Sequence, residues 1–522
     1  MPEETAEDPA LPARPASDDR DGWAAYWQEQ GQPWRTEPEI DGERQRVLAA
    51  RRDQPHGNTA AAPFAGIEPG LTRADIEWLL AAHEDGRGPV DWRDERQRTR
   101  AGLDLRGAQL AGAHLAGLPL ARLRAGLTSD EWRNASARRM EGAAGHFERA
   151  DLTGAQLEGA VLEGVHLEGA RLRGAALEQA NLSFVLLEGA TLSEANLERA
   201  DLTGAHMDGA MLPDARLAGA TLTRAMLAGA DLSDAHLEGA RLVAARLGGR
   251  TLEDAALARI RRGWPDAPAT LPGANLCGAF FDNATALDEA ALGDETAEGG
   301  VALADLRWGG ANLAVIDWAL LKTLGDEREA REAAHTGNKP KDDALRLAEY
   351  RTAVRANRQL AVALREQGLN EEADRFAYRA HTLQRAVYLR QALRSSAPRG
   401  RPGARRSEIG QRLLRFGQYV FSLFLDALAG YGYRPGRSLV AYIGSLVVFA
   451  ALYYVVGQHT GARLDAVEAI SLSINSFHGR GFFPGTVTPS DAVTLLTAVQ
   501  AILGLVIEIS FIATFTQRFF GR

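Results

Sequence analysis

From Asp151 onward, apolar and polar positions recur with a period of five residues, beginning with DLTGAQLEGAVLEGVHLEGA. A large apolar residue occupies every fifth position from Leu152 to Leu257, which is 22 successive units, and only Met207 replaces leucine there. We call this large apolar residue the centre of its unit. A small residue lies two positions before each centre: Ala in nineteen units and Val in two, with Arg250 as the exception. A period of five fits neither an α-helix nor a β-strand, so a run of this length predicts a solenoid.

Each unit is expected to turn one corner. The central leucine and the small residue point inward together, because alternate residues of extended backbone face the same side. The units ANLSF, ADLTG, ADLSD and ANLER resemble the pentapeptide-repeat family, whose motif is A(D/N)LXX. The resemblance implies a right-handed, four-sided β-helix with four units per coil, so that coils would stack at roughly 4.8 Å.

The repeat is less regular at both ends of the solenoid. We interpret residues 1–62 as a mostly disordered acidic region and 63–148 as a cap that includes the first units and a helical insertion at 128–148. The β-helix itself is predicted over 149–325. Further centres are expected at the following residues: Leu105, Leu110, Leu115 and Leu120 before the insertion, and Leu276, Phe281, Leu306 and Leu313 after the regular run.

Two helical segments follow the solenoid. Residues 342–395 are charged, free of proline and patterned as two amphipathic helices with a turn at 368–370. This hairpin resembles one tetratricopeptide-type unit. Residues 396–437 then form a basic linker and an interfacial helix. The nine Arg and two acidic residues of 394–437 give this region a local charge of +7, which favours contact with anionic lipid headgroups.

The carboxyl-terminal part has the composition of a membrane domain. Residues 438–457 carry no charge over twenty positions, and 492–515 form a second apolar stretch with one acid. Arginines flank the outer ends of both stretches. The positive-inside rule therefore predicts a multi-pass protein of the inner (plasma) membrane, with the N-terminus, the solenoid and the C-terminus in the cytoplasm.

Between these spans, 463–475 can form a helix too short to cross, and SFHGRGFFPG follows it. This order resembles the two-transmembrane, potassium-channel-like pore domain over residues 438–522, with a re-entrant pore loop. The resemblance implies a pore loop consisting of Ser476, Phe477, His478, Gly479, Arg480, Gly481, Phe482 and Phe483. Only the two glycines match the T-x-G-Y-G filter, so potassium selectivity does not follow. Arg480 either faces the pore axis or points away as a supporting residue.

The second span carries a polar stripe at helical spacing. Thr497, Gln500, Gly504 and Glu508 share one face and are predicted to line the pore as its inner helix. Glu508 would then form an acidic ring, or alternatively bond a neighbouring helix in its protonated form. Gly504 suits either helix bending or close helix packing. The Gly430–Gly432 sequence GYG precedes both spans, and we interpret it as a turn.

These features predict an oligomeric, cation-conducting channel, a tetramer by the bacterial channel resemblance, with the solenoid as a cytosolic regulatory or sensor domain. The alternative is a membrane-anchored scaffold whose solenoid recruits a cytosolic partner. The expected partners are copies of the chain, lipid and permeant ions. The net charge of −9 argues against nucleic-acid binding, and a single cysteine, Cys277, excludes a disulfide framework. No catalytic signature, metal cluster or cofactor motif is found, so an enzyme is not expected.

Overall fold

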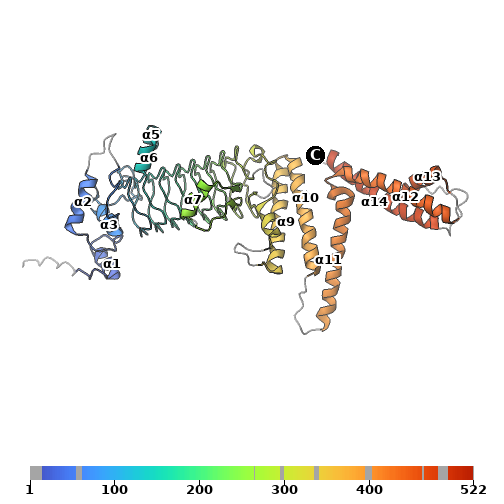
Figure 1. Ribbon diagram of the computed structural model, residues 1–522, viewed down its shortest axis with the longest axis horizontal. Helices are drawn as coiled ribbons and strands as arrows, with labels where there is room; N and C mark the ends of the chain where they lie inside the picture. Colours follow the sequence, from blue (N-terminus) through green and yellow to red (C-terminus); the bar gives the residue numbers. More distant parts are fainter. Residues whose placement is uncertain are drawn as a thin grey trace, which may run out of the picture. The chain divides into compact units, whose positions relative to one another are not determined.

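The computed structural model describes residues 14–53, 62–263, 265–293, 299–333, 340–393, 402–460, 464–479 and 492–520. The chain divides into two compact units, Met1–Glu329 and Ala330–Arg522. The first contains the solenoid, and the second is helical. Figure 1 shows the coils of the first unit stacked one after another beside α3.

Parallel backbone pairing every twenty residues builds the solenoid. Asp151 pairs with Arg171, and Arg171 pairs with Thr191, so each coil consists of four five-residue units as predicted. The amide of Leu152 donates to the carbonyl of Arg171 at 2.7 Å, and the amide of Arg171 donates to Ala150 at 2.9 Å. Each coil is thereby hydrogen-bonded to the coils on both sides, and the predicted β-helix is confirmed.

Leucine and alanine fill the interior of the coils. Leu202 and Ala205 have no exposed surface, and the other centres of the regular run are exposed by 2% or less up to Leu247. Each buried leucine contributes roughly 1.5–3 kcal/mol. Each unit centred from Leu152 to Leu242 turns through a residue with positive φ, which is often glycine. At Gly159 φ is +62°, and an added Cβ would lie 2.8 Å from the Trp92 ring.

The amino-terminal region is more ordered than the sequence predicts. Helices α1 (Arg20–Glu29) and α2 (Gly42–Arg52) lie within 1–62, so the prediction of a mostly disordered region is wrong for these residues. Trp23 and Trp27 are buried and stack 5.9 Å apart, and Arg35 lies over the Trp27 ring. This aromatic cluster supplies the apolar burial that composition alone did not reveal. Helices α3 (Arg73–Ala81) and α4 (His83–Gly86) follow.

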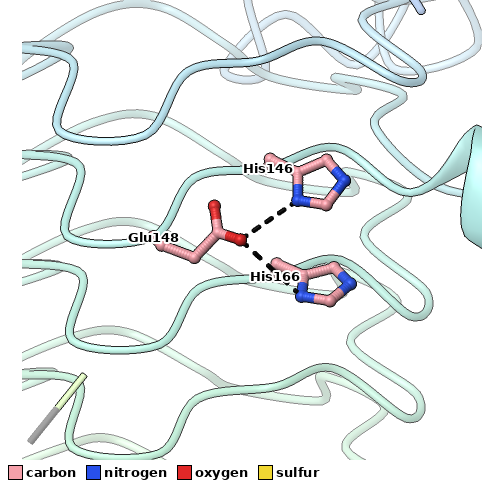
Figure 2. A group of neighbouring side chains, drawn as sticks. All are labelled: His146, Glu148 and His166. Atoms are coloured by element: carbon pink, nitrogen blue, oxygen red, sulfur yellow. Dashed lines mark hydrogen bonds and ion pairs between the residues drawn. The ribbon is translucent and has the colours of Figure 1, made fainter. Parts of the chain in front are cut away.

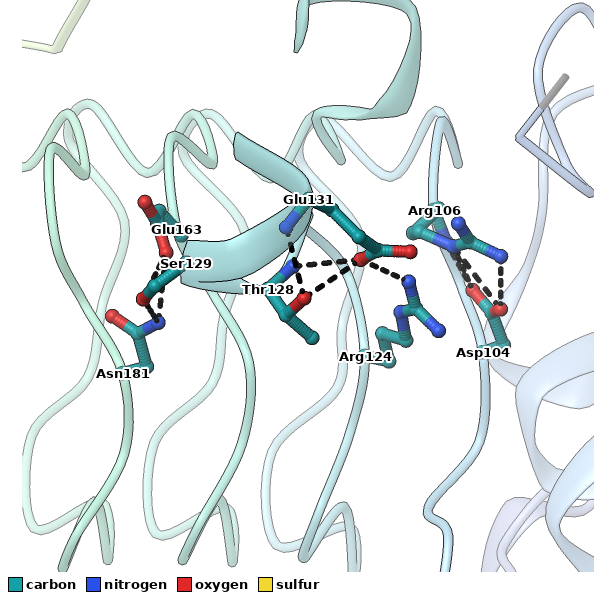
Figure 3. A network of polar contacts seen from close by, with 8 residues as sticks. All are labelled: Asp104, Arg106, Arg124, Thr128, Ser129, Glu131, Glu163 and Asn181. Atoms are coloured by element: carbon teal, nitrogen blue, oxygen red, sulfur yellow. Dashed lines mark hydrogen bonds and ion pairs between the residues drawn. The ribbon is translucent and has the colours of Figure 1, made fainter. Parts of the chain in front are cut away.

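The predicted helical insertion is confirmed as α5 (Ser129–Arg133) and α6 (Ala137–Ala143). Thr128 and Glu131 form a capping box at the start of α5, and Arg124 of the solenoid donates to Glu131 at 2.5 Å (Figure 3). Burial would raise the pKa of Glu131, but the Thr128 amide and Arg124 together lower it to about 2. Ser129 also bonds Glu163 of the next coil, which anchors α5 to the solenoid.

The regular coils end before the five-residue spacing of the sequence does. After Leu247 the chain leaves the coil as β1 (Arg250–Thr251), α7 (Asp254–Gly263) and β2 (Thr270–Leu271). The expected centres at Leu252 and Leu257 are therefore outside the coils. The physical reason is Arg250, which cannot replace the small inward residue, together with the preceding glycines. The later pairing of Ala302 and Arg307 also puts Leu306 at the small-residue position and not at a centre.

The first unit closes with η1 (Leu313–Val315), and α8 (Gly325–Arg331) crosses into the second. The second unit consists of α9 (Asp343–Glu366), α10 (Asn370–Leu393), α11 (Pro402–Ala429), η2 (Gly430–Gly432), α12 (Pro435–Thr460), α13 (Ala466–Phe477) and α14 (Ala492–Phe520). Helices α9 and α10 pack as a hairpin (Figure 1), and the GYG sequence forms the predicted turn.

The Glu131 contacts predict a pH-dependent anchoring of α5. Replacing Glu131→Gln should destabilise the insertion locally by about 1–2 kcal/mol, because an ion pair and part of a helix cap are weakened. The pKa of about 2 lies below the ordinary value of 4.5, so this contribution is present above pH 4.5 and is lost as pH falls towards 2. Hydrogen exchange of the α5 amides, corrected for intrinsic rates, measures the difference.

The matched control is Asp130→Asn, whose carboxylate is 87% exposed and pairs with the exposed Arg133. It should leave the exchange of α5 nearly unchanged. An equal effect of the two substitutions, or a Glu131→Gln effect that does not shrink in acid, would contradict the assigned role.

Candidate functional site

Two helices of the second unit are long and apolar enough to cross a membrane. These segments are Gly436–His459 of α12 and Ala492–Ala513 of α14. Only 11% and 22% of them are buried inside the structure. The core helix of a soluble domain would be mostly covered, so their exposed apolar surface favours a lipid or protein neighbour.

The short helix α13 packs against both long helices. Asp465 and Glu468 form a capping box at its start. Its twelve residues span roughly 18 Å, which is too short to cross about 30 Å of hydrocarbon. A buried cluster joins the three helices, consisting of Phe449, Tyr453, Leu464, Ala469, Leu472 and Val493.

A chain of buried polar contacts fixes this packing. The Tyr453 hydroxyl donates to Gln500 Oε1 at 2.8 Å, and Gln500 Nε2 donates to Ser473 Oγ at 2.8 Å. Ser473 Oγ in turn donates to the Leu446 carbonyl at 2.9 Å. Gln500 and Tyr453 have no exposed surface. Thus α12, α13 and α14 are connected through side chains of one chain.

This arrangement corrects two predictions. Gln500 and Thr497 were expected to line a pore, but both are buried, with Thr497 bonding the Thr494 carbonyl. Tyr453, their neighbour on α12, likewise lies inside the helical packing. The physical reason is that polar groups among apolar helices need partners, and α13 supplies them within the same chain.

Gly504 and Phe477 make the closest approach between α13 and α14. A Cβ on Gly504 would lie 2.1 Å from the Phe477 carbonyl oxygen, so only glycine fits. Phe477 is buried, and the Tyr442 ring contacts its ring edge-on with centroids 4.7 Å apart. Of the two predicted roles of Gly504, close helix packing is therefore the one observed.

The residues just beyond α13 meet α14 at Glu508. His478 Nδ1 lies 2.5 Å from Glu508 Oε1, and each side chain is 36% exposed. Tyr442 Oη lies 3.3 Å from His478 Nε2. Ser476 is buried, and Gly479 has a positive φ of 65°. The predicted pore-loop residues Arg480, Gly481, Phe482 and Phe483 lie outside the described residues.

A second polar contact connects the hairpin with the first apolar helix. Asp426 of α11 accepts from Arg385 of α10 at 2.7 Å and from Arg437 of α12 at 2.7 Å, and Tyr378 donates to it at 2.9 Å. Burial would raise the pKa of Asp426, but bonds from Arg385 and Tyr378 hold it below its usual value. A cavity of about 590 Å³ lies among α9, α10, α11, η2 and α14, bordered by Tyr431.

Sequence reasoning missed the partners of several of these residues. The His478–Glu508 pair joins residues 30 apart, and the Asp426 contacts join three helices, so neither has a local motif. On the solenoid, the described residues include a group whose ligand atoms lie close enough to share a metal ion: His146, Glu148 and His166. Their twenty-residue separation hid this group as well.

Comparison with known proteins concerns the solenoid. A family model described as pentapeptide repeats matches residues 146–183, 180–217 and 215–249. Among solved structures, HetL of the cyanobacterium Nostoc sp. strain PCC 7120 is 28% identical and has a TM-score of 0.19, with 39% of this chain and 80% of that chain covered. HetL is involved in heterocyst differentiation regulation.

Rfr23 of the cyanobacterium Cyanothece 51142 is 32% identical with a TM-score of 0.13, covering 25% of this chain and 85% of that chain. QnrB1, a plasmid-mediated fluoroquinolone resistance protein, is 15% identical with a TM-score of 0.23, with 39% of this chain and 76% of that chain covered. No curated protein matches the chain.

The buried contact of Gln500 predicts a loss of stability on its removal. Gln500→Leu leaves the Tyr453 hydroxyl and Ser473 without their shared partner, which should cost about 1–3 kcal/mol and lower the melting temperature of the detergent-solubilised protein. Tyr453→Phe in the same chain should recover part of the loss. Gln458→Leu is the matched control and should cost less, because Gln458 is exposed and its bond to the Leu464 carbonyl is long, at 3.3 Å. If Gln500→Leu and Gln458→Leu lowered the melting temperature equally, the assigned Gln500 contact would be contradicted.

Proposed function

We propose that this chain, which belongs to the pentapeptide-repeat family, is an oligomeric membrane channel for cations with a regulatory solenoid. One copy has two helices apolar enough to span a membrane, which is too few to enclose a pore. Several copies are therefore required, and the sequence resemblance favours four. The solenoid and the hairpin would lie in the cytoplasm of a bacterial cell, next to the inner membrane.

The single observation that carries the proposal is the position of α13. A helix too short to span is held between two span-length helices by buried hydrogen bonds and by the Gly504–Phe477 contact. A membrane anchor needs no such element, because two apolar helices are sufficient to hold a protein in a bilayer. A re-entrant segment at membrane depth, in contrast, has to be held by protein or wetted by water.

Glu508 is the residue assigned to the permeation path. Its side chain is 36% exposed although it belongs to an apolar helix, and its only described side-chain hydrogen bond is to His478, just beyond α13. An acid within a membrane helix normally faces a bundle interior or water. Repeated in each copy, Glu508 would form a ring of negative charge that concentrates cations. Thr497 and Gln500, being buried, take no part in this ring.

The apolar surfaces of the long helices support assembly in a membrane. On α12, Val440 and Val447 are 71% and 64% exposed, and on α14 Ile502 and Leu505 are 67% and 57% exposed. These faces need lipid or another copy of the chain. On α11, exposed apolar residues accompany arginines, which suits an interfacial helix on an anionic leaflet: Leu413, Leu414, Phe416 and Phe421 beside Arg412 and Arg415.

Asp426 offers a route from the cytosolic part to the pore. It joins Arg385 of the hairpin to Arg437, one residue before the buried Ser438 of α12. A movement of α10 would therefore pull on the start of the first span. Under this proposal the solenoid and the hairpin bias the pore through that contact.

The proposal predicts a charge effect at Glu508. Glu508→Gln should reduce the single-channel cation conductance by roughly two- to tenfold and shift the reversal potential towards that of a less cation-selective pore, because the ring loses its charge. Recording from purified protein in planar bilayers, with ions exchanged on one side, measures both quantities.

Glu468→Gln is the control, because it removes an acid from α13 while glutamine still serves a capping box. It should leave the reversal potential close to that of the unmodified protein. Silence of correctly inserted protein under all ions and tensions would favour a membrane-anchored scaffold instead. An unchanged reversal potential in Glu508→Gln would exclude Glu508 from the permeation path.

A further inference from the structure

A histidine pair and two carboxylates lie together on one face of the solenoid. His146 and His166 are direct pairing partners in adjacent coils, and Glu148 and Glu168 follow each of them by two residues. The coil register therefore stacks histidine on histidine and acid on acid. The imidazole rings lie 4.6 Å apart with an angle of 22° between their planes.

The donor atoms of this group converge. His146 Nδ1 lies 3.0 Å from Glu148 Oε1, and His166 Nδ1 lies 3.8 Å from the same oxygen (Figure 2). All three ligand atoms lie within 4.8 Å of one another. Tetrahedral ligands of a zinc ion are separated by about 3.3 Å, since each lies roughly 2.0–2.1 Å from the metal. Small rotations of these side chains would therefore bring all three to one ion.

The carboxylate beside the group is buried and incompletely bonded. Glu168 has no exposed surface, and neither of its oxygens has a hydrogen-bond partner among the described residues. Its ion-pair contacts are with His166 at 3.5 Å and with Arg262 of α7 at 3.3 Å. His166 Nδ1 and Glu148 Oε2 also lack a hydrogen bond among those residues. Buried polar atoms of a folded protein are normally satisfied, so these atoms are short of the partners that a bound ion and its water would supply.

We propose that His146, Glu148 and His166 bind a divalent transition-metal ion, with Zn²⁺ as the best-suited metal. Imidazole and carboxylate ligands in a small tetrahedral site fit zinc, whereas calcium and magnesium require more oxygen ligands. A water molecule occupies the fourth position, and Glu168 accepts a hydrogen bond from it. The ion connects two adjacent coils and strengthens the place where α7 lies on the solenoid.

The ligand side chains are accessible to an entering ion. His146, Glu148 and His166 are 27%, 21% and 20% exposed, so the site opens to solvent while Glu168 is covered. Further along the solenoid and in a different column, His236 and Glu238 have the same two-residue spacing and lie 3.2 Å apart. The pairing partners of His236 are Arg216 and Phe280, so this second pair lacks the stacked histidine. It therefore provides a matched comparison within the same chain.

Metal binding to the full-length protein tests the proposal. Chelator-treated protein in detergent is equilibrated with Co²⁺, whose visible absorption is intense in a tetrahedral site, and bound metal is then counted by elemental analysis after dialysis against Zn²⁺. The unmodified chain should bind one ion per chain with a tetrahedral Co²⁺ spectrum. His166→Gln and His146→Ala should each abolish that spectrum and lower bound zinc by about one ion per chain, whereas His236→Ala should retain both.

Circular dichroism of each variant without metal shows whether the solenoid has folded. A folded His166→Gln variant that binds as much zinc as the unmodified chain would overturn the proposal, as would equal losses in His236→Ala. Absence of a Co²⁺ spectrum in the unmodified chain would also overturn it. These outcomes do not depend on channel activity, so the site and the proposed function stand or fall separately.

Discussion

Backbone hydrogen bonding between residues twenty apart is the constraint on which the solenoid depends. The Leu152 and Arg171 amides each bond a neighbouring coil, and this ladder fixes which side chains stack. Interior positions are then restricted to Ala, Leu or similar residues, while exterior positions form columns of chemically unrelated residues. A column of chemically related side chains therefore arises only where the repeat places suitable residues in successive coils. His146 over His166 and Glu148 over Glu168 are one such column.

In the helical unit, buried side-chain hydrogen bonds take over the role that the backbone ladder has in the solenoid. Gln500 joins Tyr453 and Ser473, and Asp426 joins α10, α11 and α12. In apolar surroundings such contacts are costly to break, because no water replaces the lost partner. The Gln500 and Ser473 contacts make α13 an integral part of the helix packing. Gln500 therefore cannot also face a pore.

The sequence was most informative where its pattern is local and repeated. The period of five predicted the inward leucines and the four-unit coil, and charge and length predicted α12 and α14. It was least informative where distant residues decide the outcome. The aromatic cluster of Trp23 and Trp27 orders a segment whose acidic composition predicts disorder. The chain leaves the coils at Arg250, although the five-residue spacing continues to Leu257. Gln500 has helical spacing typical of a pore stripe, but its buried partners lie on other helices.

The excursion between Leu247 and Asn275 shows how the solenoid accommodates extra chain. A twenty-residue step from Asp231 would reach Thr251, yet Asp231 pairs with Asn275, and His236 pairs with Phe280 at the same offset. A stretch of 24 additional residues has thus been accepted at a corner, while the preceding coils keep their twenty-residue step and the next coil still pairs with them. Architecture of this kind can gain new surface elements by insertion while its interior stays unchanged, which gives evolution, or a protein engineer, a place to add a domain.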